Sequence, residues 1–453
     1  MTCEAEATKM TTARRWRQMA GAAVVLLLFA SAGARGQGVG LAAVLEMARS
    51  TDAQYAAARA AAQAAMEKLP QAIALMRPNV NFSYSVKRHH DGSSAYPGTL
   101  RYDAGGAALT INQPLFRVPL KVGAEQAEYL QQAAEKQFAL AEQELIGRVA
   151  RGYFNVLQAQ DELAAATAQR EALVQQLAQA KRSFEVGTVP VTDFNEAQAR
   201  HDIGVAQEIA ARNELESKKR TLEKSLARPL PQLMKLRRDA SVDLLGPDLL
   251  DQLVRAAPRD ALQVSIGRFL ALAAEREISK REAGHHATLD FQGTIRRDRN
   301  VNFGQFGGND TRQNSFGVEL NFPLYQGGLI SSRTREAIAE HQKALHDLTD
   351  AERQAQLEAH QAQLGVESGR ALVQALQQAL ASSETQLKST QRGLQVGVRT
   401  RVDVLNAEQQ LFATRKDLAS ARYRTLVAGL QLRAAAGALA EADLRVLDTL
   451  LSD

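Results

Sequence analysis

One sequence pattern occurs twice in the chain, and two separate segments of the pattern recur at nearly the same distance. Residues 186–193, VGTVPVTD, recur as residues 396–403, VGVRTRVD, a shift of 403 − 193 = 210 residues. Upstream, residues 109–116, LTINQPLF, recur as residues 318–325, VELNFPLY, a shift of 323 − 114 = 209 residues. Two chance matches would not keep the same spacing. The chain is therefore predicted to consist of two structural repeats, in each of which a strand unit leads through a proline into a long helix.

The first 36 residues have the pattern of a secretory signal peptide. Arg14, Arg15 and Arg17 precede an apolar run over residues 19–30, and small residues follow this run. The run is well short of the ~20 residues that span a bilayer as a helix, which makes a transmembrane anchor the weaker interpretation. The only cysteine, Cys3, lies before the run. We therefore expect an exported chain without disulfides or cysteine metal sites, located in the periplasm, in the outer membrane or outside the cell.

Four segments alternate apolar and polar residues with a period of two, which is typical of β-strands. In the first of them, Val80, Phe82, Tyr84 and Val86 are the apolar positions. We expect two β-hairpins, over residues 79–113 and 287–322. In an exported chain with no other sheet to cover them, strands with one apolar and one polar face fit an outer-membrane barrel. Lipid cannot satisfy an open strand edge, and four strands are too few for a barrel, so the barrel must be shared between subunits.

Two stretches without proline predict helices of unusual length, over residues 121–185 and 329–395. At ~1.5 Å per residue, each helix would be about 100 Å long, which indicates coiled-coil packing. A solitary coiled-coil rod is the alternative interpretation of these stretches taken alone. Single helices are also expected over Leu41–Met76 and Leu249–Arg281. The return helix of each repeat is about half as long as the long helix, and these two helices could cover the remaining half of each long helix.

These patterns predict the organisation of the whole chain. In order, we expect a signal peptide, a first repeat, a linker at mid-height, a second repeat and a C-terminal tail, over residues 1–36, 37–227, 228–248, 249–437 and 438–453. Each repeat contains a tip followed by a return helix, over residues 186–190 and 191–227 in the first copy and 396–401 and 402–437 in the second.

Composition and motifs argue against several classes of function. The net charge of +5 is small for 453 residues, and no basic stripe with interleaved aromatics occurs, so nucleic acid is not an expected partner. The adjacent pairs His89-His90 and His285-His286 have no acidic cluster beside them in sequence, which favours polar loop or rim residues over a metal site. Phosphate loops, nucleophile elbows and zinc-protease motifs are absent from the sequence. We expect no enzymatic activity, no cofactor and no metal.

Over nearly all of the mature chain, this layout resembles the TolC family of outer-membrane efflux proteins. The resemblance rests on the doubled layout, on residues 322–328, FPLYQGG, leading into a helix, and on two Val-Gly tips followed by aspartate. Pro70-Gln71 and residues 75–80, LMRPNV, resemble the branch that serves type I protein secretion. The family implies an α+β membrane protein that forms a homotrimer, with four strands per subunit in a transmembrane β-barrel and a long periplasmic α-helical barrel below it.

The resemblance also implies a gate at the helix tips. By position, Asp403 matches an acidic ring at the tunnel entrance, and Arg399 matches the arginine that locks the closed state. Thr192 and Asp193 match the partners of that arginine on the neighbouring hairpin. An arginine fork on a carboxylate in a narrow mouth is a charge-assisted bond, and a ring of Asp403 side chains would attract cations and repel anions.

The sequence departs from the family at two gate positions. Asn406 stands where a second acid is expected one turn after Asp403, and Leu394 stands where the family has a tyrosine that helps the lock. We therefore expect a gate that is less acidic and held less tightly. The alternative interpretation of Asp193 and Asp403 is that they cap the N-termini of the return helices, and both roles are compatible.

The tips are also expected to contact a partner. The residues that match the family motif touched by the helical hairpin of a periplasmic adaptor protein are Val186, Gly187, Thr188, Val396, Gly397 and Val398. The expected function is a passive exit duct in the outer membrane of a Gram-negative bacterium. It would receive protein from an inner-membrane ABC transporter or other pump through that adaptor, and would contact outer-membrane lipid. The alternatives are the outer-membrane component of a small-molecule efflux pump and, more remotely, a periplasmic structural coiled-coil protein.

Overall fold

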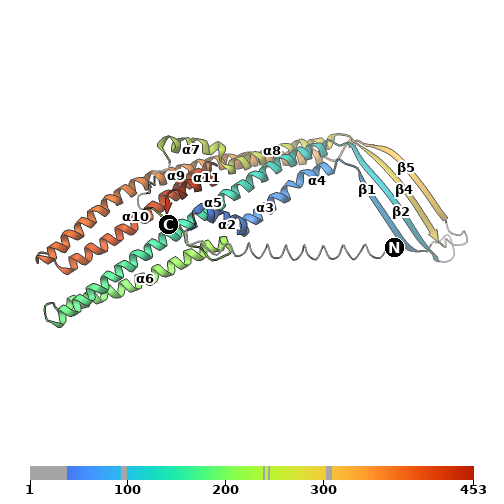
Figure 1. Cartoon of the computed structure of the whole chain (residues 1–453). Coiled ribbons are helices and arrows are strands. Elements are labelled where there is room, and N and C mark those ends of the chain that lie inside the picture. The colour runs from blue at the N-terminus through green and yellow to red at the C-terminus, as the bar shows by residue number, and fades with distance from the viewer. Residues whose placement is uncertain (1–37, 93–98, 238–239, 243–244, 302–308, 453) are drawn as a thin grey trace, which may run out of the picture.

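The computed structural model describes residues 38–452 apart from 93–98, 238–239, 243–244 and 302–308. The predicted signal peptide, residues 1–36, lies outside the described residues. Figure 1 shows an elongated, arched bundle of helices with two helical hairpins at one end and a β-sheet at the other, where the strands bend away from the bundle. None of the helices in the described part of the chain has a stretch long and apolar enough to cross a membrane.

The sheet consists of two antiparallel hairpins, one from each repeat. Its strands are β1 (Asn79–Gly92), β2 (Thr99–Phe116), β4 (Thr288–Val301) and β5 (Asn309–Asn321), in the spatial order β1-β2-β4-β5. The hairpins join through β2 and β4, where Ile111 lies opposite Gly293. The edges of the described sheet are therefore β1 and β5, whose outer backbone groups have no partner strand within the described chain.

The two faces of the sheet differ in chemistry. One cross-strand row is polar and contains Asn81, Thr110, Thr294 and Ser315. The adjacent row, on the opposite face, contains Val80, Ile111, Gly293 and Phe316. Gly293 leaves room for the ring of Phe316, since a Cβ added at this glycine would lie 2.9 Å from Phe316 Cδ1. The period-two pattern of the sequence is thus realised as one polar and one apolar face.

In both repeats shorter helices precede the β-hairpin and a long helix and a return helix follow it. In the first repeat they are α2 (Leu41–Thr51), α3 (Ala53–Met66), α4 (Lys68–Ala74), α5 (Val118–Glu185) and α6 (Val191–Leu226). In the second they are α7 (Pro247–Asp260), α8 (Leu262–Glu282), α9 (Leu329–Gln395) and α10 (Arg401–Ala435). The short elements are β3 (Lys235–Leu236), η1 (Ala283–His285), α11 (Glu441–Asp448) and β6 (Leu451–Ser452).

The prediction of single helices over Leu41–Met76 and Leu249–Arg281 was wrong, because both segments are broken. In the first, the Asp52 carboxylate accepts hydrogen bonds from the Tyr55 N–H at 2.8 Å and from Arg148 at 3.0 Å, which starts α3 anew. In the second, α7 ends just after Pro258, which lacks a backbone N–H, and the chain turns at Ala261. The two breaks are 261 − 52 = 209 residues apart, the same shift as the sequence repeat.

The segment predicted as a C-terminal tail is an integral part of the fold. It contains α11, whose Leu444 and Leu447 are buried, and β6, which pairs with β3 in the inter-repeat segment. The carboxylate of Asp448 accepts hydrogen bonds from the N–H groups of Leu41 at 2.6 Å and Ala42 at 3.1 Å. Asp448, at the end of α11, therefore caps the N-terminus of α2.

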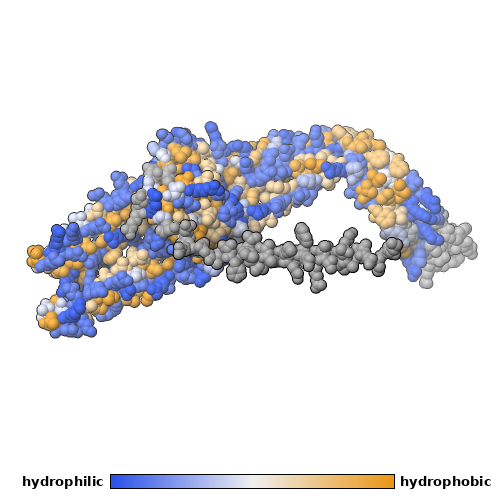
Figure 2. All heavy atoms as spheres, in the orientation of Figure 1, coloured by the Kyte–Doolittle hydropathy of each residue, from blue (hydrophilic) through white to orange (hydrophobic). Residues whose placement is uncertain are grey.

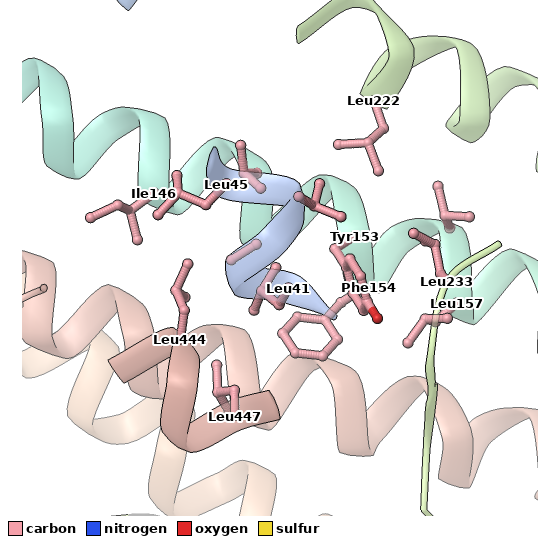
Figure 3. Packing of buried hydrophobic residues seen from close by; sticks show 14 of the residues in the cluster. Leu41, Leu45, Ile146, Tyr153, Phe154, Leu157, Leu222, Leu233, Leu444 and Leu447 are labelled. Atoms are coloured by element: carbon pink, nitrogen blue, oxygen red, sulfur yellow. The ribbon is translucent and has the colours of Figure 1, made fainter. Parts of the chain in front are cut away.

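The largest buried cluster lies halfway along α5, and we call it the waist. Figure 3 shows leucines of α2 and α11 packed around Tyr153 and Phe154 of α5. The hydroxyl of Tyr153 donates a hydrogen bond shared between the carbonyl oxygens of Val39 at 3.0 Å and Met234 at 2.9 Å. Because each fully buried large side chain contributes about 1.5–3 kcal/mol, this cluster is a major source of stability.

An ion pair between the repeats fixes the junction of sheet and helices. Arg117, which precedes α5, binds the carboxylate of Asp290 on β4 through Nε at 2.8 Å and Nη2 at 2.5 Å. Asp290 is buried, so its charge depends on this two-point contact. The pair connects the residue that precedes the first long helix to the second hairpin, at the bend that separates sheet from bundle.

Candidate gate at the helix tips

The first tip joins α5 to α6 and is closed by an aromatic stack. Gly187 takes a positive φ of 74°, which lets the chain turn directly after the helix end. The rings of Phe184 and Phe194 stack with centroids 6.0 Å apart. Pro190 precedes α6, and no side chain caps this helix. Asp193 stands in its first turn, where a carboxylate favours the helix dipole, but it does not act as the predicted cap.

The second tip joins α9 to α10 and is closed by a capping box. Gly397 takes the equivalent positive φ of 80°. The Asp403 N–H donates to Thr400 Oγ1 at 3.2 Å, and the Thr400 N–H donates back to Asp403 Oδ2 at 2.9 Å. Bonds with the backbone and then the side chain of Thr400 hold the pKa of the Asp403 carboxyl below its usual range. The cap interpretation is therefore confirmed for Asp403, which also keeps its negative charge at the tip.

The two hairpins of the chain are joined by polar contacts near the tips. Arg200 on α6 donates to Asn406 Oδ1 on α10 at 3.1 Å. Arg401, at the start of α10, reaches Ser183 Oγ on α5 at 3.4 Å. Asn406 is the position where the sequence departs from the acidic pattern, and here its amide oxygen accepts a bond from an arginine of the other repeat.

A third contact between the hairpins lies farther from the tips than the Arg401–Ser183 contact. Gln176 on α5 donates to the Glu408 carboxylate on α10. Burial raises the pKa of Glu408, while the side chains of Gln176 and Gln391 act in the opposite direction. Glu408 lines a cavity of about 200 Å³ together with Asp193 and Leu394. The tip region therefore contains a titratable carboxyl that is partly removed from water.

These contacts between hairpins could not be read from the repeat. Arg200 corresponds to Gln410 in the other copy, and Glu408 corresponds to Gln198, since both pairs are 210 residues apart (410 − 200 and 408 − 198). Comparison of the two repeats therefore does not single out Arg200 or Glu408. In the sequence their charges resemble those of ordinary solvated helix faces. Only the packing of α10 against α5 and α6 brings them together.

The predicted lock is not assembled within one chain. Arg399 is exposed at the second tip, and its Cγ lies 2.7 Å from where a Cβ on Gly393 would stand. Thr192 is exposed at the first tip. Among the described residues, no hydrogen bond or ion pair joins Arg399 to Thr192 or Asp193. The structure thus places an exposed cation on one hairpin and its predicted partners on the other.

The tip motifs present apolar side chains to solvent. Val186 is 73% exposed, and Val396 and Val398 are each 76% exposed. Thr188 is also exposed, and its hydroxyl donates to the Ser183 carbonyl at 2.9 Å. Figure 2 shows apolar side chains at the ends of both hairpins, on a surface that is otherwise largely polar. Exposed valines in this setting are typical of a contact surface rather than of a folded core.

Comparison with known proteins agrees with this architecture. The family described as outer membrane efflux protein matches residues 44–228 and 268–438. Outer membrane protein TolC of Vibrio cholerae is 30% identical over 407 residues, covering 89% of this chain and 92% of that protein. Proteases secretion protein PrtF of Dickeya chrysanthemi is 29% identical over 438 residues, covering 94% of each.

A solved structure has the same fold. The outer membrane protein VceC from Vibrio cholerae superposes with a TM-score of 0.72 at 19% identity, covering 88% of this chain and 96% of that one. TolC-family channels act as trimers with periplasmic adaptors and inner-membrane transporters. The sheet is this chain's share of a transmembrane β-barrel, and the long helices are its share of a periplasmic helical barrel. The chain therefore belongs to the outer membrane efflux protein family, as an outer-membrane channel of the TolC type and not as an enzyme.

Proposed function

We propose that three copies of this chain form the exit duct of a tripartite system for type I, ABC transporter-driven protein secretion. The observation that carries the secretion assignment is the similarity to PrtF, a protease secretion protein, which extends over 94% of both chains. The residues over 70–80 that resemble the type I branch support the same assignment. The duct itself is passive, so energy comes from the transporter.

The edges of the sheet require it to close with further copies of the chain, and the number three comes from the family. β1 and β5 are 14 and 13 residues long and carry unpaired backbone groups on their outer sides. In a bilayer such groups cost several kcal/mol each, so an open edge is not viable in lipid. Pairing β5 of one copy with β1 of the next removes every edge. The polar face, with Asn81, Thr110 and Ser315, then lines the lumen, and the apolar face contacts lipid.

The gate closes between copies. Arg399 is exposed at the second tip, and we infer that it binds Thr192 and Asp193 on the neighbouring copy's first hairpin. Within each copy, Arg200–Asn406 and Arg401–Ser183 hold the second hairpin against the first. Opening requires both sets of contacts to break, and the Asp403 side chains form the charged ring that a substrate then passes.

The exposed valines at the tips dock the adaptor. Val186, Val396 and Val398 provide apolar contact area. A Cβ added at Gly187 or Gly397 would meet nothing within 4 Å, so each turn leaves room for the close approach of another helix. A helical hairpin of a periplasmic adaptor fits this surface. Docking there would pull on the tips, where the hairpins are held by few bonds.

A deletion strain tests the proposal. We expect the culture supernatant to lose one or a few secreted proteins, with unchanged susceptibility to a panel of dyes and antibiotics, and the wild-type gene to restore secretion. Raised drug susceptibility with an intact secreted set would overturn the type I assignment in favour of small-molecule efflux. Reintroducing the chain with Val396→Asp and Val398→Asp should fail to restore secretion while the protein still reaches the outer membrane as a trimer.

A further inference from the structure

The apolar face of the sheet ends in arginines at the end far from the helices. On this face β1 runs from Val80 to Val86 and then reaches Arg88. On β4, Ile295 is followed at the next position of the same face by Arg297, and then by Arg299. On β5, the position opposite Arg297 is Arg312. Figure 2 shows the same change, from apolar near the helices to polar near the far end of the strands.

The change from apolar side chains to arginines occurs at the height expected for a membrane boundary. Leu320 and Arg312 lie on the same face of β5, 320 − 312 = 8 residues apart. At ~3.3 Å per residue this is about 26 Å along the strand, or about 20 Å across the membrane for a strand tilted by ~40°. The apolar band of an outer-membrane barrel is about 25 Å tall. Since the helices lie on the periplasmic side, the arginines stand at the headgroup level of the outer leaflet.

The arginines on this face exceed the acids that compensate them. Arg88 binds Asp103 through two contacts, at 2.7 and 3.1 Å. Arg297 binds Asp310 in the same way, at 3.0 and 2.5 Å. Arg299 and Arg312 make no hydrogen bond or ion pair with any residue that the structure describes. Counting these residues, the face carries four arginines and two aspartates, a surplus of two positive charges per subunit.

The opposite face at the same height carries a smaller surplus, the one positive charge of Lys87 on β1. There Arg296 pairs with Asp298 at 2.5 Å, and its cross-strand neighbours Ala108 and Gln313 are uncharged. The larger excess of positive charge therefore lies on the side that meets lipid. A guanidinium group at a headgroup level finds its best partner in phosphate, which it binds through two parallel hydrogen bonds.

We propose that Arg299 and Arg312 form a binding site for the phosphate groups of an anionic glycolipid in the outer leaflet, with the paired Arg88 and Arg297 at its border. This inference rests on the proposed function, because it needs the apolar face to contact lipid. The acyl chains of the same lipid lie against Phe82, Ile295 and Phe316 below the arginines. Phosphate above and hydrocarbon below match one amphiphile and not a soluble anion.

The test uses purified full-length trimer in detergent with lipid A carrying two phosphates as the probe. Binding is counted by native mass spectrometry and checked as a shift in the melting temperature. We expect Arg299→Gln/Arg312→Gln to weaken binding about thirtyfold, as expected for two basic residues at an anionic surface. Lipid A stripped of phosphate should bind the wild type as weakly as lipid A binds this variant. Arg296→Gln, on the same strand but the other face, is the matched control and should bind like the wild type.

Three outcomes would overturn the inference. These are equal lipid A affinity in wild type and Arg299→Gln/Arg312→Gln, an equal loss in Arg296→Gln, and full competition by millimolar inorganic phosphate, which would mean a simple anion site. Channel conductance of the same samples in planar bilayers separates the two proposals. Trimers that conduct but bind lipid A with and without phosphate equally well would contradict only the lipid site. A failure to form trimers or channels would contradict the proposed duct.

Discussion

The waist and the tips of the molecule are built from different side chains. At the waist, Tyr153, Phe154 and Leu444 are less than 2% exposed and pack against one another across several elements. Near the tips, the buried positions are mostly small, such as Ala180 and Ala407, and large side chains face solvent. The waist therefore resists rearrangement, and the tips can move at low cost because little apolar surface is exposed when they separate.

Electrostatic contacts also differ between the waist and the tips. At the waist, Arg49 of α2 contacts Glu46 at 2.5 Å, Glu142 of α5 at 2.7 Å and Glu441 of α11 at 3.2 Å, so one cation ties three helices together. At the tips, Arg200 and Arg401 each contribute a single bond between hairpins, to Asn406 and to a serine hydroxyl. A structure that is anchored at mid-height and latched weakly at one end can open at that end without unfolding.

The largest expected effect comes from breaking the waist. Phe154→Ala removes a fully buried ring and should lower the free energy of unfolding by about 3–5 kcal/mol. The measurement is the midpoint of urea or heat unfolding, with the trimer followed by gel mobility. Val446→Ala, at a 53% exposed position of α11, is the control and should change stability by about 0.5 kcal/mol or less. Similar losses in both variants would mean that the waist is not a special anchor.

A second, smaller effect sharpens the role of Asp403 at the tips. Asp403→Asn removes the charge and should lower the preference for cations in planar bilayers, because the proposed ring of Asp403 side chains would no longer repel anions. Thr400→Ala removes the side-chain bond of the capping box but leaves the charge, so cation preference should survive at neutral pH. If both variants lose the preference equally, selectivity depends on the order of the helix end and not on an acidic ring.

The pH dependence of the same preference follows from the capping box. Bonds with the backbone and side chain of Thr400 lower the pKa of Asp403 from its ordinary 3.8, because they favour the charged form. The carboxylate therefore stays ionised as pH falls to this value, and the cation preference is lost only below it. In Thr400→Ala, where only the backbone bond remains, the loss should move to higher pH. An unchanged titration in this variant would contradict a contribution of the hydroxyl to the shift.

The smallest expected effect concerns Glu408. Burial raises the pKa of this carboxyl above 4.5, so the folded tip favours its protonated form, and that stabilisation is lost as pH rises through the raised pKa. Gln176 Oε1 is buried without a hydrogen-bond partner among the described residues, and a protonated Glu408 supplies a donor for it. Acidification should therefore reduce channel opening slightly in the wild type. Glu408→Gln should open equally rarely at all pH values, and a wild-type response in this variant would assign the effect to another group.

The long elements of the fold were predictable because their signals are local. Period-two alternation and the absence of proline over some 65 residues specify strands and helices without reference to the rest of the chain. The break at Ala261 also has a local signal, Pro258, which the prediction of one helix over Leu249–Arg281 did not take into account. The break at Asp52 depends on more than local sequence. Asp52 ends α2 because Arg148 of another helix holds its carboxylate, and α11, with 8 residues, is stable only because Leu444 and Leu447 are buried by other helices.

The gate was predictable only in part for the same reason. The Thr-x-x-Asp spacing of Thr400 and Asp403 is a capping signature that sequence shows directly. The Arg200–Asn406 contact joins residues 206 positions apart with no counterpart in the other repeat, so no sequence rule connects them. Contacts between hairpins, and still more those between subunits, depend on packing that one chain's pattern does not encode.

Single-channel conductance in planar bilayers tests the central claim most directly, which is that the channel is closed by the tips and not by the waist. Arg200→Ala/Arg401→Ala removes the two arginine contacts between hairpins, while Arg49→Ala removes the comparable arginine at the waist. We predict a several-fold rise in conductance for the tip variant and none for the waist variant. Unchanged conductance in the tip variant, or an equal rise in Arg49→Ala, would contradict this claim.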